Sequence, residues 1–272
     1  QQIEDIVQLI HKASTLRFTH TGAPQHWLAG EEIWLQPIPY LARIGLASGN
    51  LKLVTNIIQM PLYNPVDIAE QVSTMDHITN GRFVLGIGNG YREVELEAAG
   101  TNRRERAPRV EESIEIMTRL WAGEELHHKG RFWNVNGRMA LTPVQKPRPP
   151  IWIAVHAEGA ARRAARMADG ALMAPQIYWD DLKRLCDAYE DECAKVGRRG
   201  TLGITPRIIV IRSPKERRAA LAKMKADAIH SIDRYRNWDM QESGMVNIRL
   251  ERADNDPTNY AFIGSPEEII EK

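Results

Sequence analysis

The clearest hydrophobic pattern in the chain lies in residues 64–90. Apolar residues recur at close to helical spacing over 65–78, and Pro65 has the fixed φ that suits a first helical turn. Asn-Gly at 80–81 predicts the end of this helix, because glycine adopts the left-handed conformation that closes many helices. The run RFVLGI at 82–87 lacks polar alternation, which indicates a strand covered on both faces in a parallel sheet.

A glycine-rich loop, Gly-Ile-Gly-Asn-Gly at 86–90, follows at the end of this predicted strand. Parallel α/β folds bind ligands beyond the carboxyl ends of their strands, and glycines let a backbone approach a ligand closely. The same pattern also occurs in a plain strand-to-helix turn. The loop is therefore a candidate ligand site. Only the surrounding sequence can distinguish a ligand-binding loop from a plain turn.

Several segments together carry a family resemblance. Residues 64–90, the Gly-Thr-Asn at 100–102, Arg106 and the run EESIEIMTRLWAGE at 111–124 resemble the bacterial luciferase-like flavin-dependent oxidoreductases. The segment PPIWIAVHAEGAARRAARMADG at 149–170 is similar to the family's fifth strand and the helix after it. The resemblance covers nearly the whole chain and implies an α/β fold, a (β/α)8 TIM-type barrel.

The rest of the pattern predicts alternating strands and helices. Parallel barrel strands are expected at 17–21, 51–58, 82–87, 151–155, 171–174 and 203–211. Helices are expected at 3–16, 36–48, 107–122, 161–168, 179–196 and 214–232. A hairpin insertion is expected at 126–141, with Gly130 and Asn136-Gly137 as turn signals. We expect one luciferase-like barrel domain over 1–272, with the first and last strands not present in this sequence.

Two features are predicted near the end of the chain. Residues 235–259 look irregular and polar, and long segments of that kind often cover active sites. After them Ser265, Pro266 and Glu268 predict a helix start in which serine caps, proline takes the first position and glutamate completes a capping box.

Composition narrows the classes of partner. Lys and Arg number 36 against 35 acidic residues, so no excess positive field favours nucleic acid or an anionic membrane. Cys186 and Cys193 are seven positions apart on a predicted helix, about 10 Å along its axis, and are expected to stay reduced. No apolar run approaches the roughly 20 residues that span a bilayer, and no signal-type segment opens the chain. We expect a cytoplasmic homo-oligomer that acts on a small-molecule substrate.

His26 is the candidate catalytic residue. It follows the strand predicted at 17–21 and matches a family histidine that is often at the flavin's reactive edge, whereas the acidic residue common just before it is Gln25 here. Imidazole titrates near neutral pH, so His26 is suited to donate a proton or a hydrogen bond to the flavin. The alternative is a loop histidine that only packs on Trp27.

The cofactor-binding candidates come from three strand ends. Asn56 and Ile57 lie in a segment that resembles the one behind the isoalloxazine ring, where several family members have a non-proline cis peptide. Gly88 and Asn89 belong to the glycine loop. The resemblance implies that the turn after strand 151–155 holds the cofactor's phosphate, and helix-start amides suit that role. This turn contains His156, Ala157, Glu158 and Gly159, with Arg162 or Arg163 close behind.

Other chemistry is not predicted. His127 and His128 are adjacent on an expected strand, so their side chains point to opposite faces. No acidic or cysteine partner stands at the spacing of metal ligands, and we therefore predict no metal site. Glu111, Glu112 and Glu115 look like the solvated face of a helix rather than an acid/base pair.

The sequence fits four classes of function to different degrees. The resemblance favours an enzyme that uses reduced FMN, supplied by a flavin reductase, and O2 to oxidise a small organic substrate. A hydride-transfer enzyme that uses a deazaflavin coenzyme matches the glycine loop equally well. A non-catalytic flavin-binding barrel is a third alternative, in which His26 would be dispensable. A hydrolase is disfavoured because the sequence has no G-x-S-x-G nucleophile motif.

Overall fold

The computed structural model describes residues 2–174, 177–237 and 256–271. The chain packs as two compact units, one of Gln1–Gly90 with Val94–Ala154 and the other of Tyr91–Glu93 with Val155–Lys272. A single domain over 1–272 stays a prediction.

The first unit is built on parallel strands. Neighbours lie in the order β1 (His20–Ala23), β2 (Lys52–Thr55), β4 (Phe83–Gly88) and β7 (Ile151–Val155), and every adjacent pair is parallel. A short strand, β3 (Ile58–Gln59), also pairs with β4 in parallel. Every residue of β4 is buried, as its unbroken apolar run predicted.

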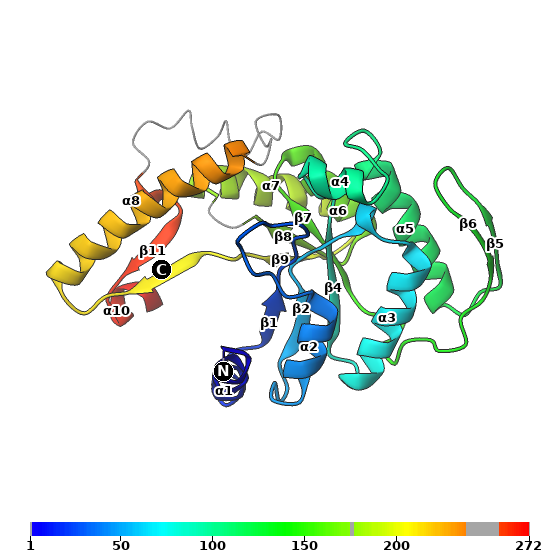
Figure 1. Cartoon of the computed structure of the whole chain (residues 1–272), viewed down its shortest axis with the longest axis horizontal. Helices are drawn as coiled ribbons and strands as arrows, with labels where there is room; N and C mark the ends of the chain where they lie inside the picture. The colour runs from blue at the N-terminus through cyan, green and yellow to red at the C-terminus, as the bar shows by residue number, and fades with distance from the viewer. Residues whose placement is uncertain (1, 175–176, 238–255, 272) are drawn as a thin grey trace. The chain divides into compact units, whose positions relative to one another are not determined.

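Helices pack against this sheet and against each other. Helix α2 (Pro37–Gly45) packs on β2, α3 (Pro65–Ile78) packs on β4, and α5 (Arg106–Trp121) packs on α3; Figure 1 shows these helices beside the strands. Helix α3 has the predicted bounds. Asn64 caps it by accepting a hydrogen bond from the Val66 amide at 2.9 Å, and Gly81 follows it with φ +75°. The amphipathic helix α1 (Gln2–Ser14) and the short helix α4 (Glu93–Ala98) complete the helices of this part of the chain.

Two predicted strands have different bounds in the structure. The strand expected at 17–21 begins at His20, because its register is set by pairing with Lys52 to Thr55 of β2. The strand expected at 51–58 divides into β2 and β3, and the peptide bond between them, Asn56–Ile57, is cis.

The hairpin is confirmed as an antiparallel pair of β5 (Leu126–Lys129) and β6 (Asn134–Gly137). Asn136-Gly137 was predicted to form a turn. In the structure both residues belong to β6, where they pair with His127 and Leu126. Glu112 is not on a solvated face either. Its side chain is 11% exposed, and it accepts hydrogen bonds from the Phe132 amide at 3.1 Å and the Trp133 amide at 2.9 Å. The prediction was wrong because the hairpin folds back over this part of α5.

The second unit alternates helices and strands. Its elements are α6 (Glu158–Met167), β8 (Gly170–Met173), α7 (Trp179–Lys195), β9 (Thr201–Gly203), β10 (Arg207–Val210), α8 (Pro214–Asn237), the 3-10 turn Pro257–Asn259, β11 (Ala261–Gly264) and α10 (Pro266–Ile270). The single strand expected at 203–211 is two strands: β9 pairs with β8, and β10 pairs with β11 in a separate parallel sheet. Pro206 lies between them and has no amide to continue a strand ladder.

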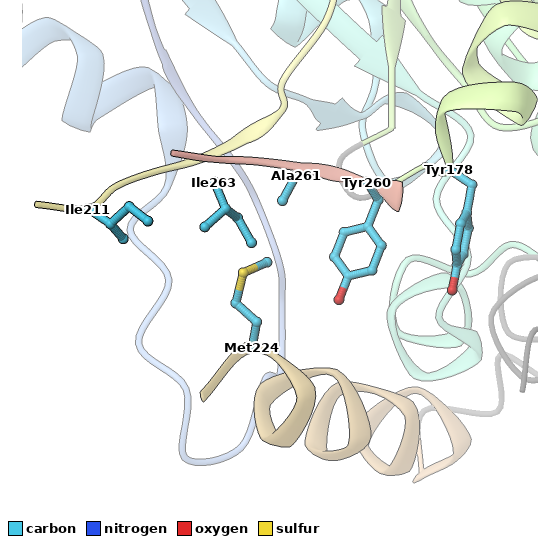
Figure 2. Close-up of a cluster of buried hydrophobic side chains, with 6 residues drawn as sticks. All are labelled: Tyr178, Ile211, Met224, Tyr260, Ala261 and Ile263. Carbon is cyan, nitrogen blue, oxygen red and sulfur yellow. The ribbon is translucent and has the colours of Figure 1, made fainter. Parts of the chain in front are cut away.

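Strand β11 was not predicted, and Ala261 and Ile263 of this strand belong to a hydrophobic cluster of this unit. Figure 2 shows Met224 of α8 pointing toward Ile263 of β11, with Tyr260 next to Tyr178. The two tyrosine rings meet edge to face, with centroids 5.6 Å apart. The capping box of Ser265 and Glu268 at the start of α10 is confirmed. Of the segment expected to be irregular, 235–259, residues 238–255 lie outside the described residues.

Within the described part of the chain, no helix is both long and apolar enough to cross a bilayer. Cys186 and Cys193 are free thiols on α7. No group of three or more His, Cys, Asp or Glu side chains among the described residues is placed to hold a metal ion.

Candidate functional site

The candidate residues of the first unit follow the carboxyl ends of neighbouring strands. His26 comes after β1, Asn56 and Ile57 after β2, and Gly88 ends β4. The strands are parallel and Ala23 pairs in register with Thr55, so these ends lie at one edge of the sheet. The Asn56 amide donates to the Ala23 carbonyl at 2.7 Å, which joins the first two ends directly. The structure therefore brings four predicted site residues to one sheet edge.

Gly88 is needed for the close packing of Ile57. A Cβ at Gly88 would lie 2.8 Å from Ile57 Cδ1 and 3.3 Å from Ala154 Cβ. The Ile57 side chain therefore lies over the end of β4. Gly90 has φ +70°, and a Cβ there would come within 2.8 Å of Gln59 Oε1. Both glycines permit approaches that a side chain would block.

Gln59 was missed by the sequence analysis. It is 2% exposed, and among the described residues its Oε1 has no hydrogen-bond partner. A buried acceptor without a donor is costly, so a partner for it is expected. The isoalloxazine system of a flavin carries a ring N–H, and the acceptor beside the glycine loop fits such a group.

His26 has an acidic partner from a distant part of the sequence. Its Nδ1 lies 3.0 Å from Glu95 Oε1, and the His26 side chain is 11% exposed while that of Glu95 is fully buried. The same carboxylate oxygen accepts a hydrogen bond from the backbone amide of Trp27 at 2.7 Å. The family resemblance implies an acidic residue just before the histidine, where this chain has Gln25. The acidic partner of His26 is instead Glu95 on α4. Glu95 carries no distinctive local signal, because it is one of three alternating glutamates in a short helix.

The environment of Glu95 keeps it ionised. Burial by itself raises the pKa of this carboxyl, but hydrogen bonds from His26 and the Trp27 amide, with the charge of His26, lower the pKa below its usual value. A carboxylate can only accept hydrogen bonds, so Nδ1 of His26 carries a proton. Nε2 is then the ring nitrogen that can gain or lose one, the arrangement that general acid/base catalysis requires.

The two residues that flank His26 are held by one hydroxyl group. Tyr63 Oη accepts a hydrogen bond from Trp27 Nε1 at 3.2 Å and another from the side-chain amide of Gln25. Gln25 is 3% exposed, and its Oε1 accepts a hydrogen bond from the backbone amide of Gln59 at 2.9 Å. Burial raises the pKa of Tyr63, so this hydroxyl stays protonated at neutral pH. Tyr63 therefore links the His26 loop to the segment after β3.

We expect Tyr63→Phe to lower the free energy of unfolding by about 1–2 kcal/mol, because the buried Gln25 amide and the Trp27 indole lose an acceptor. The measurement is urea unfolding at neutral pH. Tyr40→Phe on α2 is the matched control and should change the value by less than about 0.5 kcal/mol. Equal stability of the two variants would contradict the role given to the Tyr63 hydroxyl.

An open pocket of about 420 Å³ adjoins His26. Its walls include Trp27, Glu32, Trp34 and Gln36. The Trp34 ring meets the His26 ring edge to face, with centroids 4.9 Å apart and planes at 83°. The catalytic candidate is therefore reached from a space large enough for a small ligand.

Asn89 directly follows Gly88 in the first unit, and the other predicted residues lie in the turn before α6 or within this helix, in the second unit. Helix α6 begins at Glu158, three positions earlier than expected, and Ala157 precedes it with no side-chain cap. Its first-turn amides are consequently not satisfied by a capping side chain, which suits an anion. His156 is exposed, and a Cβ at Gly159 would meet nothing within 4 Å. A phosphate that contacts both this turn and Gly88 or Asn89 stays a prediction.

The fold is that of an α/β protein with a parallel sheet, and the candidate site lies at the carboxyl ends of its strands. A family model for luciferase-like monooxygenases matches residues 1–272, and the chain belongs to this family.

Two curated relatives represent different chemistries. The F420-dependent glucose-6-phosphate dehydrogenase of Nakamurella multipartita is 32% identical over 171 residues, which are 60% of this chain and 49% of the relative. The oxygenase component of the flavin-dependent trigonelline monooxygenase of Acinetobacter baylyi is 28% identical over 167 residues, 59% of this chain and 46% of the relative. The chain spans about half the length of the curated relatives it matches.

Solved structures share the fold. Monooxygenase RslO1 from Streptomyces bottropensis matches with a TM-score of 0.79 at 21% sequence identity. The match covers 97% of this chain and 85% of the RslO1 chain. An F420-dependent secondary alcohol dehydrogenase in complex with an F420-acetone adduct has a TM-score of 0.79 at 16% identity, covering 100% and 84%. The predicted α/β fold of the TIM-barrel type is thereby confirmed.

Proposed function

We propose that this protein is a flavin-dependent monooxygenase that uses reduced FMN and O2 to oxidise a small organic substrate. The observation that carries the proposal is the His26–Glu95 pair beside an open pocket, at the sheet edge where the Gly88 loop and the Asn56–Ile57 segment also end. A buried carboxylate behind an imidazole is a typical acid/base arrangement.

The protein residues fit a flavin at this edge. Asn56 and Ile57 would lie behind the ring, Gly88 and Asn89 would give backbone access, and Gln59 Oε1 would accept a ring N–H. The turn of His156, Ala157, Glu158 and Gly159 would hold the phosphate through the first amides of α6. When bound, reduced FMN supplies the activation of O2, which no protein side chain provides.

The work of the chain itself is to position groups and to move a proton. Glu95 orients the His26 ring and fixes the proton on Nδ1, so that Nε2 can exchange one with the reacting groups. The Trp34 ring packs on the His26 ring, with the two planes close to perpendicular. We propose that a separate flavin reductase supplies the reduced cofactor, and that the protein works as a homo-oligomer.

Hydride transfer to a deazaflavin is the second candidate, and one specific observation favours it. Several curated relatives, including the one from Nakamurella multipartita, are F420-dependent dehydrogenases. A histidine backed by a carboxylate is as well suited to accept the hydroxyl proton of an alcohol as to assist an oxygenation.

Reconstitution with each cofactor tests the proposal. We expect the protein to bind FMN more tightly than coenzyme F420 in fluorescence titrations, and to consume O2 when reduced FMN and substrate are present. Tighter F420 binding without O2 consumption would replace the monooxygenase by the dehydrogenase. FMN binding without any turnover would indicate a non-catalytic flavin-binding barrel.

A further inference from the structure

Gln25 precedes His26, and its buried side-chain amide is hydrogen-bonded at both ends. Its Oε1 accepts a hydrogen bond from the Gln59 backbone amide at 2.9 Å. Its Nε2 donates to Gln36 Oε1 at 3.2 Å and to the Tyr63 hydroxyl. A backbone N–H can only donate, so the oxygen of the Gln25 amide must face Gln59 and the nitrogen must face the other two partners. One orientation of this amide therefore satisfies all three contacts.

Gln59 returns the contact. Its Nε2 donates to the Gln25 backbone oxygen at 3.5 Å, so the two glutamines bond to each other through two separate hydrogen bonds. Both residues are almost fully buried, at 3% and 2% exposed. Loss of one partner from a buried hydrogen bond leaves the other unsatisfied, which makes such bonds costly to break. The reciprocal pair therefore joins the two segments firmly.

This pair connects the main chain at His26 to the end of a neighbouring strand. Gln59 is the last residue of β3 and lies in register with Gly88 of β4. The Glu95 carboxylate holds the ring of His26 from α4, whereas Gln25 holds the adjoining main chain from β3. The position of His26 relative to the Gly88 strand end consequently depends on Gln25.

We propose that Gln25 is a positioning residue, which fixes the His26 imidazole relative to the strand ends of Gly88 and the Asn56–Ile57 segment. The inference rests on the proposed function, because that function places the reacting ring at this sheet edge. Gln25 acts through His26 and not on the reacting atoms. A displacement of about 1 Å can lower a rate about 100-fold, so the loss of Gln25 should affect turnover more than ligand binding.

Gln25→Met tests this role, because methionine is close to glutamine in length and has no amide group. At saturating reduced FMN and substrate we expect turnover to fall about 10-fold to 100-fold. The dissociation constant of FMN should change by less than about 2-fold, because the expected cofactor contacts come from other residues. Unchanged turnover, or a loss confined to FMN affinity, would overturn the proposal.

Gln145→Met is the matched control. The Gln145 side-chain amide also donates two hydrogen bonds, to Asp76 Oδ1 at 2.7 Å and to the Phe83 carbonyl at 2.8 Å, but it does so at the amino end of β4. Its loss should lower the free energy of unfolding and leave turnover unchanged at a temperature where the variant is folded. An equal loss of turnover in both variants would mean that Gln25 acts only through stability.

Proton NMR of the His26 ring gives a readout that needs no cofactor. A proton on Nδ1 that is bonded to a buried carboxylate exchanges slowly with water, and its downfield signal is assigned by its absence in His26→Ala. We expect this signal to broaden or disappear in Gln25→Met and to persist in Gln145→Met. If both variants keep the signal unchanged, His26 keeps its place without Gln25 and the proposal fails.

The NMR result separates this inference from the proposed function. If the signal responds as expected but the wild type neither binds FMN nor consumes O2, the proposed function fails and the placement of His26 by Gln25 stands. If the wild type turns over and Gln25→Met keeps both the turnover and the signal, the positioning role fails and the proposed function stands.

Discussion

Replacing His26 with alanine should lower turnover about 100-fold to 10,000-fold, the range that a general acid or base typically supplies. The affinity for FMN changes little, because the contacts expected to hold the cofactor come from other strand ends. Oxygen consumption at saturating reduced FMN measures the first quantity, and a fluorescence titration measures the second.

His127→Ala is the matched control for this variant, since His127 is an exposed residue of the β5–β6 hairpin. It should retain full activity. Full activity of His26→Ala, or loss of flavin with normal turnover of the enzyme that still binds it, would make His26 a packing or cofactor-binding residue.

Glu95→Gln should have the second-largest effect, lowering turnover about 100-fold. Glutamine keeps the shape of the side chain but removes the negative charge that stabilises a protonated His26 and fixes its ring. Because the carboxylate is fully buried and accepts two hydrogen bonds, the free energy of unfolding at neutral pH should also fall, by about 1–3 kcal/mol.

The difference in unfolding free energy between the wild type and Glu95→Gln should depend on pH in a definite direction. The pKa of Glu95 is lowered in the folded protein, so the unfolded chain binds the proton more readily. The stability that Glu95 contributes is therefore fully present above its ordinary pKa of 4.5 and is lost as the pH falls through the lower folded value. Urea unfolding should show that the difference between wild type and Glu95→Gln shrinks in acid.

Glu97→Gln serves as the control, because Glu97 is exposed on the same short helix. Its unfolding free energy should stay close to that of the wild type at neutral pH. A difference between wild type and Glu95→Gln that stays constant or grows as the solution is acidified would contradict the assigned pKa direction.

Local sequence patterns determined the elements that carry the site. Helix 65–78 and strand 151–155 were predicted with the bounds that the structure has. Strand 82–87 was placed within one residue at each end. Pro65, the turn at Gly81 and the apolar runs sufficed, because the signals that begin, end and bury these elements lie within a few neighbouring positions.

Contacts between distant positions were decided only by the tertiary structure. Glu95 meets His26 across 69 positions, and Glu112 is covered by hairpin amides 20 and 21 positions away. Both glutamates have the local pattern of a solvated helix face. A periodic pattern records which face of a helix is apolar, whereas the burial of a carboxylate depends on which later segment folds over it and supplies hydrogen-bond donors. The sequence therefore made His26 a candidate, and only the folded chain showed that the Glu95 carboxylate is its partner.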